Sequence, residues 1–173
     1  MGKRVIIIGT SCCGKSTLAK RISKKLRIPH FELDNYFWKE NWTESSKEEF
    51  IEKVANLVNE NNWVICGNYN KVREMLWKSA TDIVWLDYPF YLVFYRAIKR
   101  TIIRAITKEK VCNGNLETFK KSFFSKESII LWVLKTYKRR KKEYPILLKE
   151  VSEKRIYRLK NKRETTSFVE NEL

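Results

Sequence analysis

Short runs of apolar residues alternate along the chain with longer segments in which apolar residues recur every three or four positions. A run of four or five apolar residues is typical of a parallel strand buried on both faces, and the longer period is typical of a helix with one buried face. We therefore predict five strands, which cover residues 5–8, 30–33, 63–66, 83–86 and 155–159.

Helices are predicted between these strands. The segment 15–26 carries a stripe of small or apolar side chains at Leu18, Ala19, Ile22 and Leu26. Ser45 or Ser46 can cap a second helix, because a Glu follows each of them three residues later. Further helices are predicted over residues 71–78, 90–107, 125–142, 144–151 and 163–171.

Alternating strands and helices indicate a doubly wound α/β sheet with right-handed crossovers. Ligands of such sheets bind at the carboxyl ends of the strands. This places Gly9, Asp34, Gly67 and Asp87 along one edge of the sheet. Because no repeat or low-complexity linker divides the sequence, we expect residues 1–173 to form a single domain.

The first predicted strand leads into a phosphate-binding motif. Residues 9–16 match the pattern G-x-x-x-x-G-K-[ST], and a predicted helix follows. The glycines let backbone N–H groups point at phosphate oxygens, Lys15 brings a charge to the β and γ phosphates, and the Ser16 hydroxyl suits Mg²⁺. We expect ATP with magnesium to bind through Gly9, Thr10, Ser11, Cys12, Cys13, Gly14, Lys15, Ser16 and Thr17.

A carboxylate is expected to complete the magnesium shell of such a site. The third strand ends in Cys66 and Gly67, and a thiol is a poor ligand for magnesium, which prefers oxygen. Asp34 and Asp87 end neighbouring strands and could each supply the carboxylate. We favour Asp34, with Ser16, as the metal site, and interpret Asp87 as a turn or helix-capping residue.

The net charge of +16 lies in one segment. Residues 91–163 carry 22 Lys and Arg against six acidic residues, which a polyanionic ligand, nucleic acid or solvated helix faces could explain. The four cysteines lack CxxC spacing and accompany one His, which argues against a zinc site or a disulfide framework. Because no apolar run approaches the length of a membrane helix, we expect a cytoplasmic protein with no membrane partner.

Several motifs occur in an order that resembles a known family. They are the phosphate loop, Leu33-Asp34-x-x-Phe37-Trp38, residues 63–69 ending in Gly67-Asn68-Tyr69, residues 85–89 leading to Arg96 and Arg100, and residues 159–164. Together they resemble the adenylate-kinase-related P-loop proteins labelled DNA topology modulation proteins. The resemblance implies a three-layer α/β/α P-loop NTPase fold, a five-stranded parallel sheet in the order 2-3-1-4-5, and a helical lid at about residues 105–125. Cys66 departs from the Asp that relatives commonly have there.

The resemblance also implies roles for residues outside the phosphate loop. Arg100 and Arg104, which share one face of the helix before the lid, are expected to reach the nucleotide phosphates and to act in catalysis with Lys15 and Asp34. Lys160 and Asn161 are expected to border the adenine. The acceptor side is expected to contain Asp34, Tyr36, Asn68, Tyr69 and Arg73.

Three functions remain open from the sequence. The leading one is a small-molecule or nucleotide kinase that transfers the γ-phosphoryl group of ATP to an acceptor. The alternative is an ATP-dependent, nucleic-acid-associated protein that modulates DNA topology and uses the basic segment 91–163, above all the run at 138–142. A third is an ATP-binding protein with slow catalysis, because of Cys66. The protein is expected to be a monomer or a homodimer.

Overall fold

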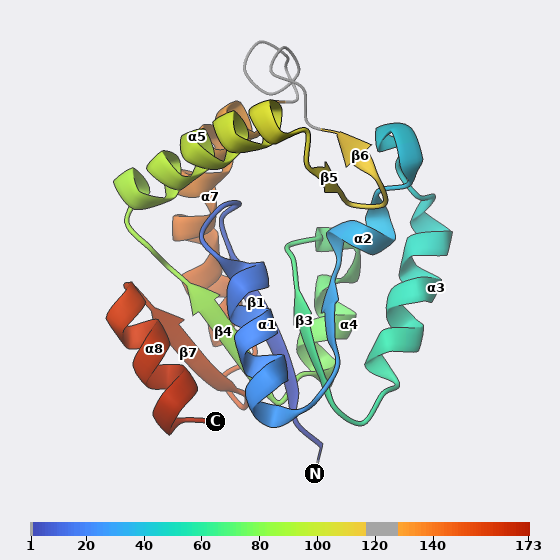
Figure 1. Ribbon diagram of the computed structural model, residues 1–173. Helices are drawn as coiled ribbons and strands as arrows, with labels where there is room; N and C mark the ends of the chain where they lie inside the picture. The colour runs from blue at the N-terminus through green and yellow to red at the C-terminus, as the bar shows by residue number, and fades with distance from the viewer. Residues whose placement is uncertain (1, 117–127) are drawn as a thin grey trace.

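The computed structural model describes residues 2–116 and 128–173, which form a parallel sheet covered by helices on both faces (Figure 1). The sheet of this described part has five strands in the order β2-β3-β1-β4-β7. The fifth strand of this sheet is labelled β7, because the two strands of a small hairpin, β5 and β6, precede it along the chain. The strands are β1 (Arg4–Gly9), β2 (His30–Glu32), β3 (Trp63–Cys66), β4 (Asp82–Leu86) and β7 (Arg155–Leu159). The predicted fold class and the five strands are confirmed.

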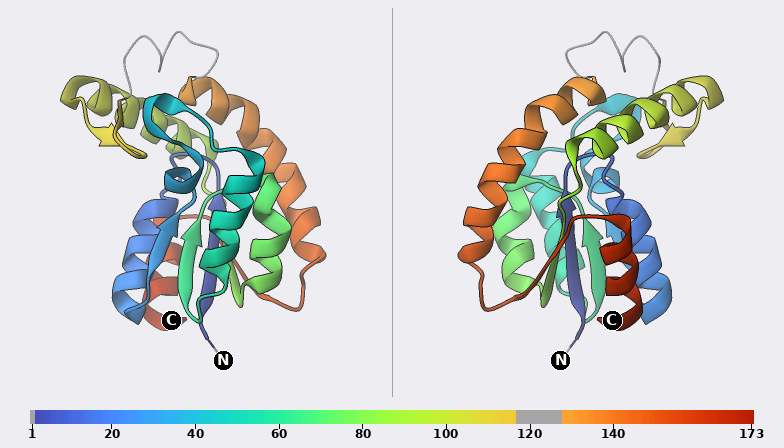
Figure 2. Two further views of the ribbon diagram at one scale, coloured as in Figure 1. Left: turned by 90° about the vertical axis from the view of Figure 1, so that its right-hand side faces the viewer. Right: turned by 90° about the vertical axis from the view of Figure 1, so that its left-hand side faces the viewer.

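Helices form the two outer layers, as the edge-on views show (Figure 2). On one face α1 (Lys15–Leu26) packs beside α8 (Lys162–Asn171), and on the other lie α3 (Lys47–Val58) and α4 (Asn70–Ser79). Ser46 caps α3 by accepting a hydrogen bond from the Glu49 N–H at 3.1 Å. No helix of the described residues is long and apolar enough to cross a membrane.

The core divides in two because side chains alternate along a strand. Val5 and Ile7 of β1 face the cluster that contains α1 and α8, whereas Ile6 and Ile8 face the cluster that contains α3 and α4. All four side chains are buried. The central strand therefore contributes to both faces, as the continuous apolar run predicts.

The second half of the chain differs from prediction in two places. Residues 129–149 form one helix, α7 (Ile129–Lys149), with Pro145 inside it, where two helices over 125–142 and 144–151 were expected; residues 125–127 lie outside the described part. The predicted break between these two helices was wrong, because Tyr144 and Leu148 lie on one face of a single helix and are buried against the sheet. In addition, the region expected as a helical lid, about residues 105–125, contains an antiparallel hairpin, β5 (Lys110–Val111) with β6 (Asn115–Leu116), and its residues 117–125 lie outside the described part.

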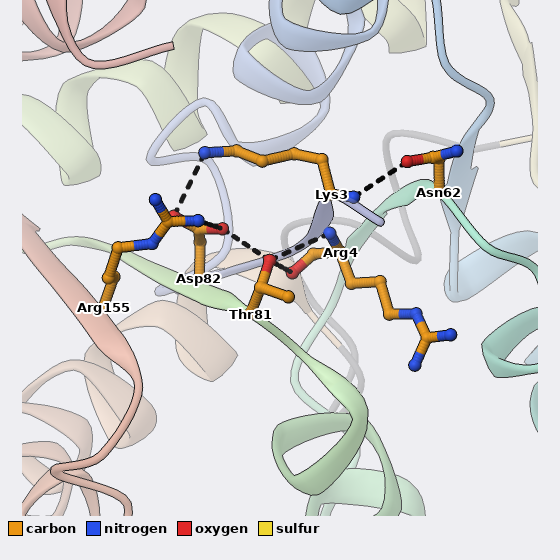
Figure 3. A network of polar contacts seen from close by, with 6 residues as sticks. All are labelled: Lys3, Arg4, Asn62, Thr81, Asp82 and Arg155. Atoms are coloured by element: carbon orange, nitrogen blue, oxygen red, sulfur yellow. Dashed lines mark hydrogen bonds and ion pairs between the residues drawn. The ribbon is translucent and has the colours of Figure 1, made fainter. Parts of the chain in front are cut away.

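A buried carboxylate ties three strands together at the amino-terminal edge of the sheet (Figure 3). Asp82 at the start of β4 is fully buried and contacts Lys3 Nζ at 3.2 Å and Arg155 Nη2 at 3.0 Å. Thr81 Oγ1 donates to the same carboxylate at 2.6 Å and accepts from the Arg4 N–H at 3.0 Å. This network fixes β1, β4 and β7 at the edge opposite the phosphate loop.

Candidate functional site

The phosphate loop joins β1 to α1 in a conformation that requires its glycines. Gly9 has φ 145° and Gly14 has φ 104°, a region that L side chains rarely adopt. A Cβ at Gly9 would lie 2.7 Å from the Leu86 carbonyl oxygen, so the position has no room for a side chain. No side chain of residues 2–116 or 128–173 caps the N-terminus of α1. The first N–H groups of that helix therefore remain available to an anion.

Lys15 and Ser16 lie at the centre of this loop. The ammonium group of Lys15 donates to the carbonyl oxygens of Gly9 and Thr10, each at 3.1 Å, and is thereby held across the loop. Ser16 Oγ donates to Glu32 Oε2 at 2.5 Å. The positive charge and the hydroxyl thus take the places that the motif predicts for phosphate and magnesium contacts.

Glu32, which the sequence reasoning missed, supplies the carboxylate beside Ser16. It is the last residue of β2 and pairs in register with Cys66 of β3. Its Oε1 also lies 3.7 Å from Lys20 Nζ. The available signal was a charged residue inside the apolar strand Phe31-Glu32-Leu33, at the carboxyl end where the ligand edge begins. The structure thus puts Glu32, rather than Asp34, against the Ser16 hydroxyl that is expected to contact magnesium.

Cys66 completes this corner as a neutral thiol. Its Sγ lies 3.9 Å from Ser16 Oγ. Burial, with a smaller contribution from the Glu32 charge, raises the pKa of the Cys66 thiol to about 12. Within residues 2–116 and 128–173, no three His, Cys, Asp or Glu side chains gather as a metal cluster. The oxygens of Ser16 and Glu32 nevertheless fit Mg²⁺, which commonly takes one or two protein ligands and completes its shell with phosphates and water.

An open cleft of about 700 Å³ separates the phosphate loop from α5 (Phe90–Thr107), which arches above it (Figure 1). Arg96 donates to the Cys13 carbonyl oxygen at 3.1 Å and lies over the Tyr88 ring. The Nε of Arg100 is buried without a hydrogen-bond partner among the described residues. Arg104 lies 3.7 Å from Glu109. The cleft is lined from α5 by Arg96, Lys99, Arg100, Ile103 and Arg104.

Of the residues expected on the acceptor side, Asp34 and Tyr69 come together. The Tyr69 hydroxyl donates to Asp34 Oδ1 at 2.6 Å, and Asp34 lines the cleft with Glu32. Burial and the Asp34 carboxylate raise the pKa of the Tyr69 hydroxyl, which therefore stays a proton donor. Tyr36 lies two residues further along on α2 (Asp34–Phe37), where its ring packs edge-on against Phe31.

Two residues expected on the acceptor side are used elsewhere. The Asn68 amide accepts from the Gly9 N–H at 3.1 Å and donates to the Gly9 carbonyl oxygen at 2.5 Å, so it braces the phosphate loop. The Tyr144 hydroxyl donates to the same amide oxygen at 3.0 Å. Arg73 lies over the Trp77 ring and lines a small separate pocket with Tyr144, and it is not among the residues that line the cleft.

The residues expected at the adenine and in the turn after β4 also have structural partners. Asn161 caps α8 by accepting from the Glu164 N–H at 2.9 Å, and the Lys160 N–H donates to the Glu164 carboxylate at 2.7 Å. From this loop region, Lys162 and Thr165 line the cleft instead. Asp87 is neither a turn nor a capping residue but a buried ion-pair partner of Arg158, at 2.6 Å, because β7 lies beside β4.

The basic run at 138–142 does not form five exposed cations in a row. Arg140 is buried over the Trp132 ring. Lys141 pairs with Asp87 at 3.3 Å, and Arg139 lies 3.8 Å from Glu143. Lys138, Arg139, Lys141 and Lys142 are all exposed. Only Arg140 is therefore withdrawn from the surface, while Arg139 and Lys141 have an acidic partner at the surface.

The sheet order, the phosphate loop after the central strand and the basic helix above it define a P-loop protein with a kinase-like fold. A family model described as AAA domain matches residues 5–111. The chain belongs to this AAA domain family.

Comparison with known proteins agrees with this assignment. The chain is 30% identical over 84 residues to a shikimate kinase of Clostridium beijerinckii, an alignment that covers 49% of this chain and 48% of the relative. It thus spans about half the length of that curated protein. The fold is similar to that of shikimate kinase from Acinetobacter baumannii in complex with shikimate (TM-score 0.62, 13% identity, 98% and 90% of the two chains). It is also similar to a gluconokinase from Sinorhizobium meliloti (TM-score 0.54, 16% identity, 98% and 91%).

Proposed function

We propose that this protein is an ATP-dependent phosphotransferase that moves the γ-phosphoryl group of ATP to a hydroxyl group of a small acceptor. The observation that carries the proposal is the juxtaposition of two kinds of group in one cleft. Lys15 and Ser16 line it from the phosphate loop, and the Asp34 carboxylate lines it from the segment after β2. A cation for the phosphates and a base for a hydroxyl are the protein groups that phosphoryl transfer requires.

Lys15, the N-terminus of α1 and Ser16 would hold the triphosphate. The Ser16 hydroxyl and the Glu32 carboxylate, 2.5 Å apart, are the groups proposed to hold magnesium. When bound, the ion would neutralise part of the phosphate charge and so favour attack by the acceptor. Asp34 is therefore not needed as a magnesium ligand, and we propose that it binds the acceptor.

Asp34 is proposed to bind the acceptor hydroxyl and to receive its proton as the oxygen attacks. Its Oδ1 accepts the hydrogen bond of Tyr69, which fixes the orientation of the carboxylate and leaves Oδ2 for the acceptor. The acceptor oxygen takes the phosphoryl group, ADP leaves, and the proton remains on Asp34 until solvent removes it. The relatives named shikimate kinase and gluconokinase suggest small polyhydroxylated compounds as the first acceptors to examine.

Arg100 and Arg104 are proposed to contact the phosphates as charge moves from the γ-phosphoryl group to the leaving oxygen. The Nε of Arg100, which is buried without a partner in the described part of the chain, supports this role, because an unsatisfied buried donor costs free energy that an anion would recover. Arg96 already donates to the loop and is better suited to holding its backbone. We do not extend the proposal to nucleic acid, because within the run at 138–142 Arg140 is buried and Arg139 and Lys141 already pair with acidic residues.

The proposal is tested by ADP formation from ATP and magnesium with a panel of sugars, sugar acids, other hydroxylated compounds and nucleosides. We expect one acceptor class to stimulate ADP formation. Lys15→Ala should abolish this turnover, whereas Lys24→Ala, an exposed base on the same helix, should retain it. Tight ATP binding without acceptor-dependent turnover across the panel would contradict the proposal.

A further inference from the structure

The β5–β6 hairpin is fastened to the segment that carries Asp34. The side-chain amide of Asn113, in the turn of the hairpin, donates to the carbonyl oxygens of Asn35 and Trp38, both at 2.7 Å. The amide of Asn115 donates to the Lys39 carbonyl oxygen at 2.8 Å. Two residues of the hairpin thus satisfy three backbone carbonyl groups of one neighbouring segment (the acceptor segment, residues 34–42).

The acceptor segment also donates to the hairpin. The Trp42 N–H donates to Asn115 Oδ1 at 2.6 Å, and the Trp42 indole donates to the Leu116 carbonyl oxygen at 3.1 Å. Asn115 is only 4% exposed, so its bond with the Trp42 N–H is shielded from water, whereas the bond of the indole is exposed. The hairpin and the acceptor segment are therefore joined by five hydrogen bonds, although about 75 residues separate them along the chain.

Both sides of this junction contain a residue with positive φ, and the one at Trp42 needs support. Trp42 has φ 56° and Asn113 has φ 62°. A bulky residue such as Trp rarely adopts a positive φ, so surrounding contacts must hold Trp42 in this state. The two hydrogen bonds of Trp42 to the hairpin are such contacts. Loss of the junction should therefore let the acceptor segment relax to a different conformation.

On its other side the hairpin continues α5. Lys108, with φ 49°, ends the helix, and Glu109 lies 3.7 Å from Arg104. The junction thus links the helix that carries Arg100 and Arg104 to the segment that carries Asp34. In Figure 1, α5 and the hairpin together arch over the phosphate loop and end beside α2.

We propose that the hairpin Lys110–Leu116 is a latch, in which Asn113 and Asn115 are positioning residues that hold the arginines of α5 over the cleft while the acceptor segment is docked. The inference rests on the proposed phosphotransferase function. It adds a coupling between the arginines of α5 and the acceptor segment. Movement of the acceptor segment on acceptor binding is transmitted to α5 through the latch. Neither asparagine needs to touch ATP or the acceptor to do this.

Asn113→Asp tests the latch with almost no change in shape. The carboxylate cannot donate, and it would face the carbonyl oxygens of Asn35 and Trp38, so repulsion should open the junction. Asn113 is exposed, so the variant should fold. Asn41→Asp is the matched control: it makes the same charge change within the acceptor segment, at an exposed residue with φ 56° that Asp tolerates.

Hydrogen exchange of the full-length protein gives a readout that needs no acceptor. In Asn113→Asp we expect faster exchange in peptides that cover residues 35–43 and 108–116 together, and no change in β1 or β3. The control should exchange like the unmodified protein. Faster exchange in the hairpin alone would overturn the latch, because the two segments would then not be coupled.

Kinetics test the consequence for transfer. We expect Asn113→Asp to lower acceptor-dependent kcat about tenfold, because misplacing catalytic groups by a fraction of an ångström costs rates of this order. The dissociation constant of ATP should change less than about twofold. Coupled exchange with an unchanged kcat would refute the positioning role. If the unmodified protein transfers to no acceptor, the proposed function fails, and hydrogen exchange still decides whether the latch exists.

Discussion

At the scale of single residues, the source of the carboxylate beside Ser16 matters most. Cys66 occupies the end of β3, where relatives of the resembled family commonly have Asp, and its thiol is buried with a pKa of about 12. The neighbouring strand supplies Glu32 instead, whose longer side chain reaches Ser16. Because the two residues are register partners, a carboxylate on either strand can serve the same corner of the site. Under the proposed function, Cys66 therefore does not leave this corner without a carboxylate.

Glu32→Gln should separate magnesium binding from nucleotide binding. The amide keeps the shape but loses the charge that suits Mg²⁺, so the affinity for ATP with magnesium should fall about tenfold or more. Without magnesium, affinity should be unchanged or slightly higher, because one negative charge near the phosphates is gone. Calorimetric titration with and without a chelator measures both. If Asp34→Asn, and not Glu32→Gln, showed this magnesium-dependent loss of ATP affinity, Asp34 would be the magnesium ligand.

At the scale of elements, α5 brings positive charge to the cleft above the phosphate loop. Arg96, Arg100 and Arg104 recur every four residues and so share a face of the helix, and all three line the cleft. Their surroundings differ. Arg96 bonds to the loop backbone, Arg100 has an unpartnered Nε within the described part of the chain, and Arg104 lies near Glu109 at the start of the hairpin. One helical face can therefore combine anchoring, phosphate contact and coupling.

Replacing both Arg100 and Arg104 by Ala should reduce acceptor-dependent turnover about 10²-fold to 10³-fold, the range seen when donors to a developing charge are removed. ATP affinity should fall much less, because the phosphate loop remains. Steady-state kinetics and a separate binding titration distinguish the two effects. Lys135→Ala, an exposed base on α7, is the control. A loss of ATP affinity with kcat unchanged would contradict the role, because the arginines would then bind the ground state and the transition state equally.

At the scale of the whole molecule, stability and chemistry are concentrated at opposite edges of the sheet. The Asp82 network joins β1, β4 and β7 at their amino ends (Figure 3), whereas the phosphate loop, Glu32 and Asp34 lie at carboxyl ends. Substitutions at the first edge should therefore change stability with little effect on the site.

Asp82→Asn should lower the free energy of unfolding by about 2 kcal/mol, since it removes the charge that Lys3 and Arg155 face. This figure lies below the value for a fully buried ion pair because Arg155 is largely exposed. Urea denaturation measures the loss. The ATP dissociation constant below the transition should be unchanged, and an equally large loss of ATP affinity would contradict the separation of the two edges.

The sequence alone determined the strands, most helix boundaries and the phosphate loop, because these depend on apolar spacing and on residues adjacent along the chain. Only the tertiary structure decided which side chains meet: Glu32 with Ser16, Asn68 with Gly9, Asn161 with its own helix, and Asn113 with Asn35. The first, second and fourth contacts join distant positions, so strand register and the docking of loops fix them. For the same reason the latch, which joins residues about 75 positions apart, became visible only in the fold.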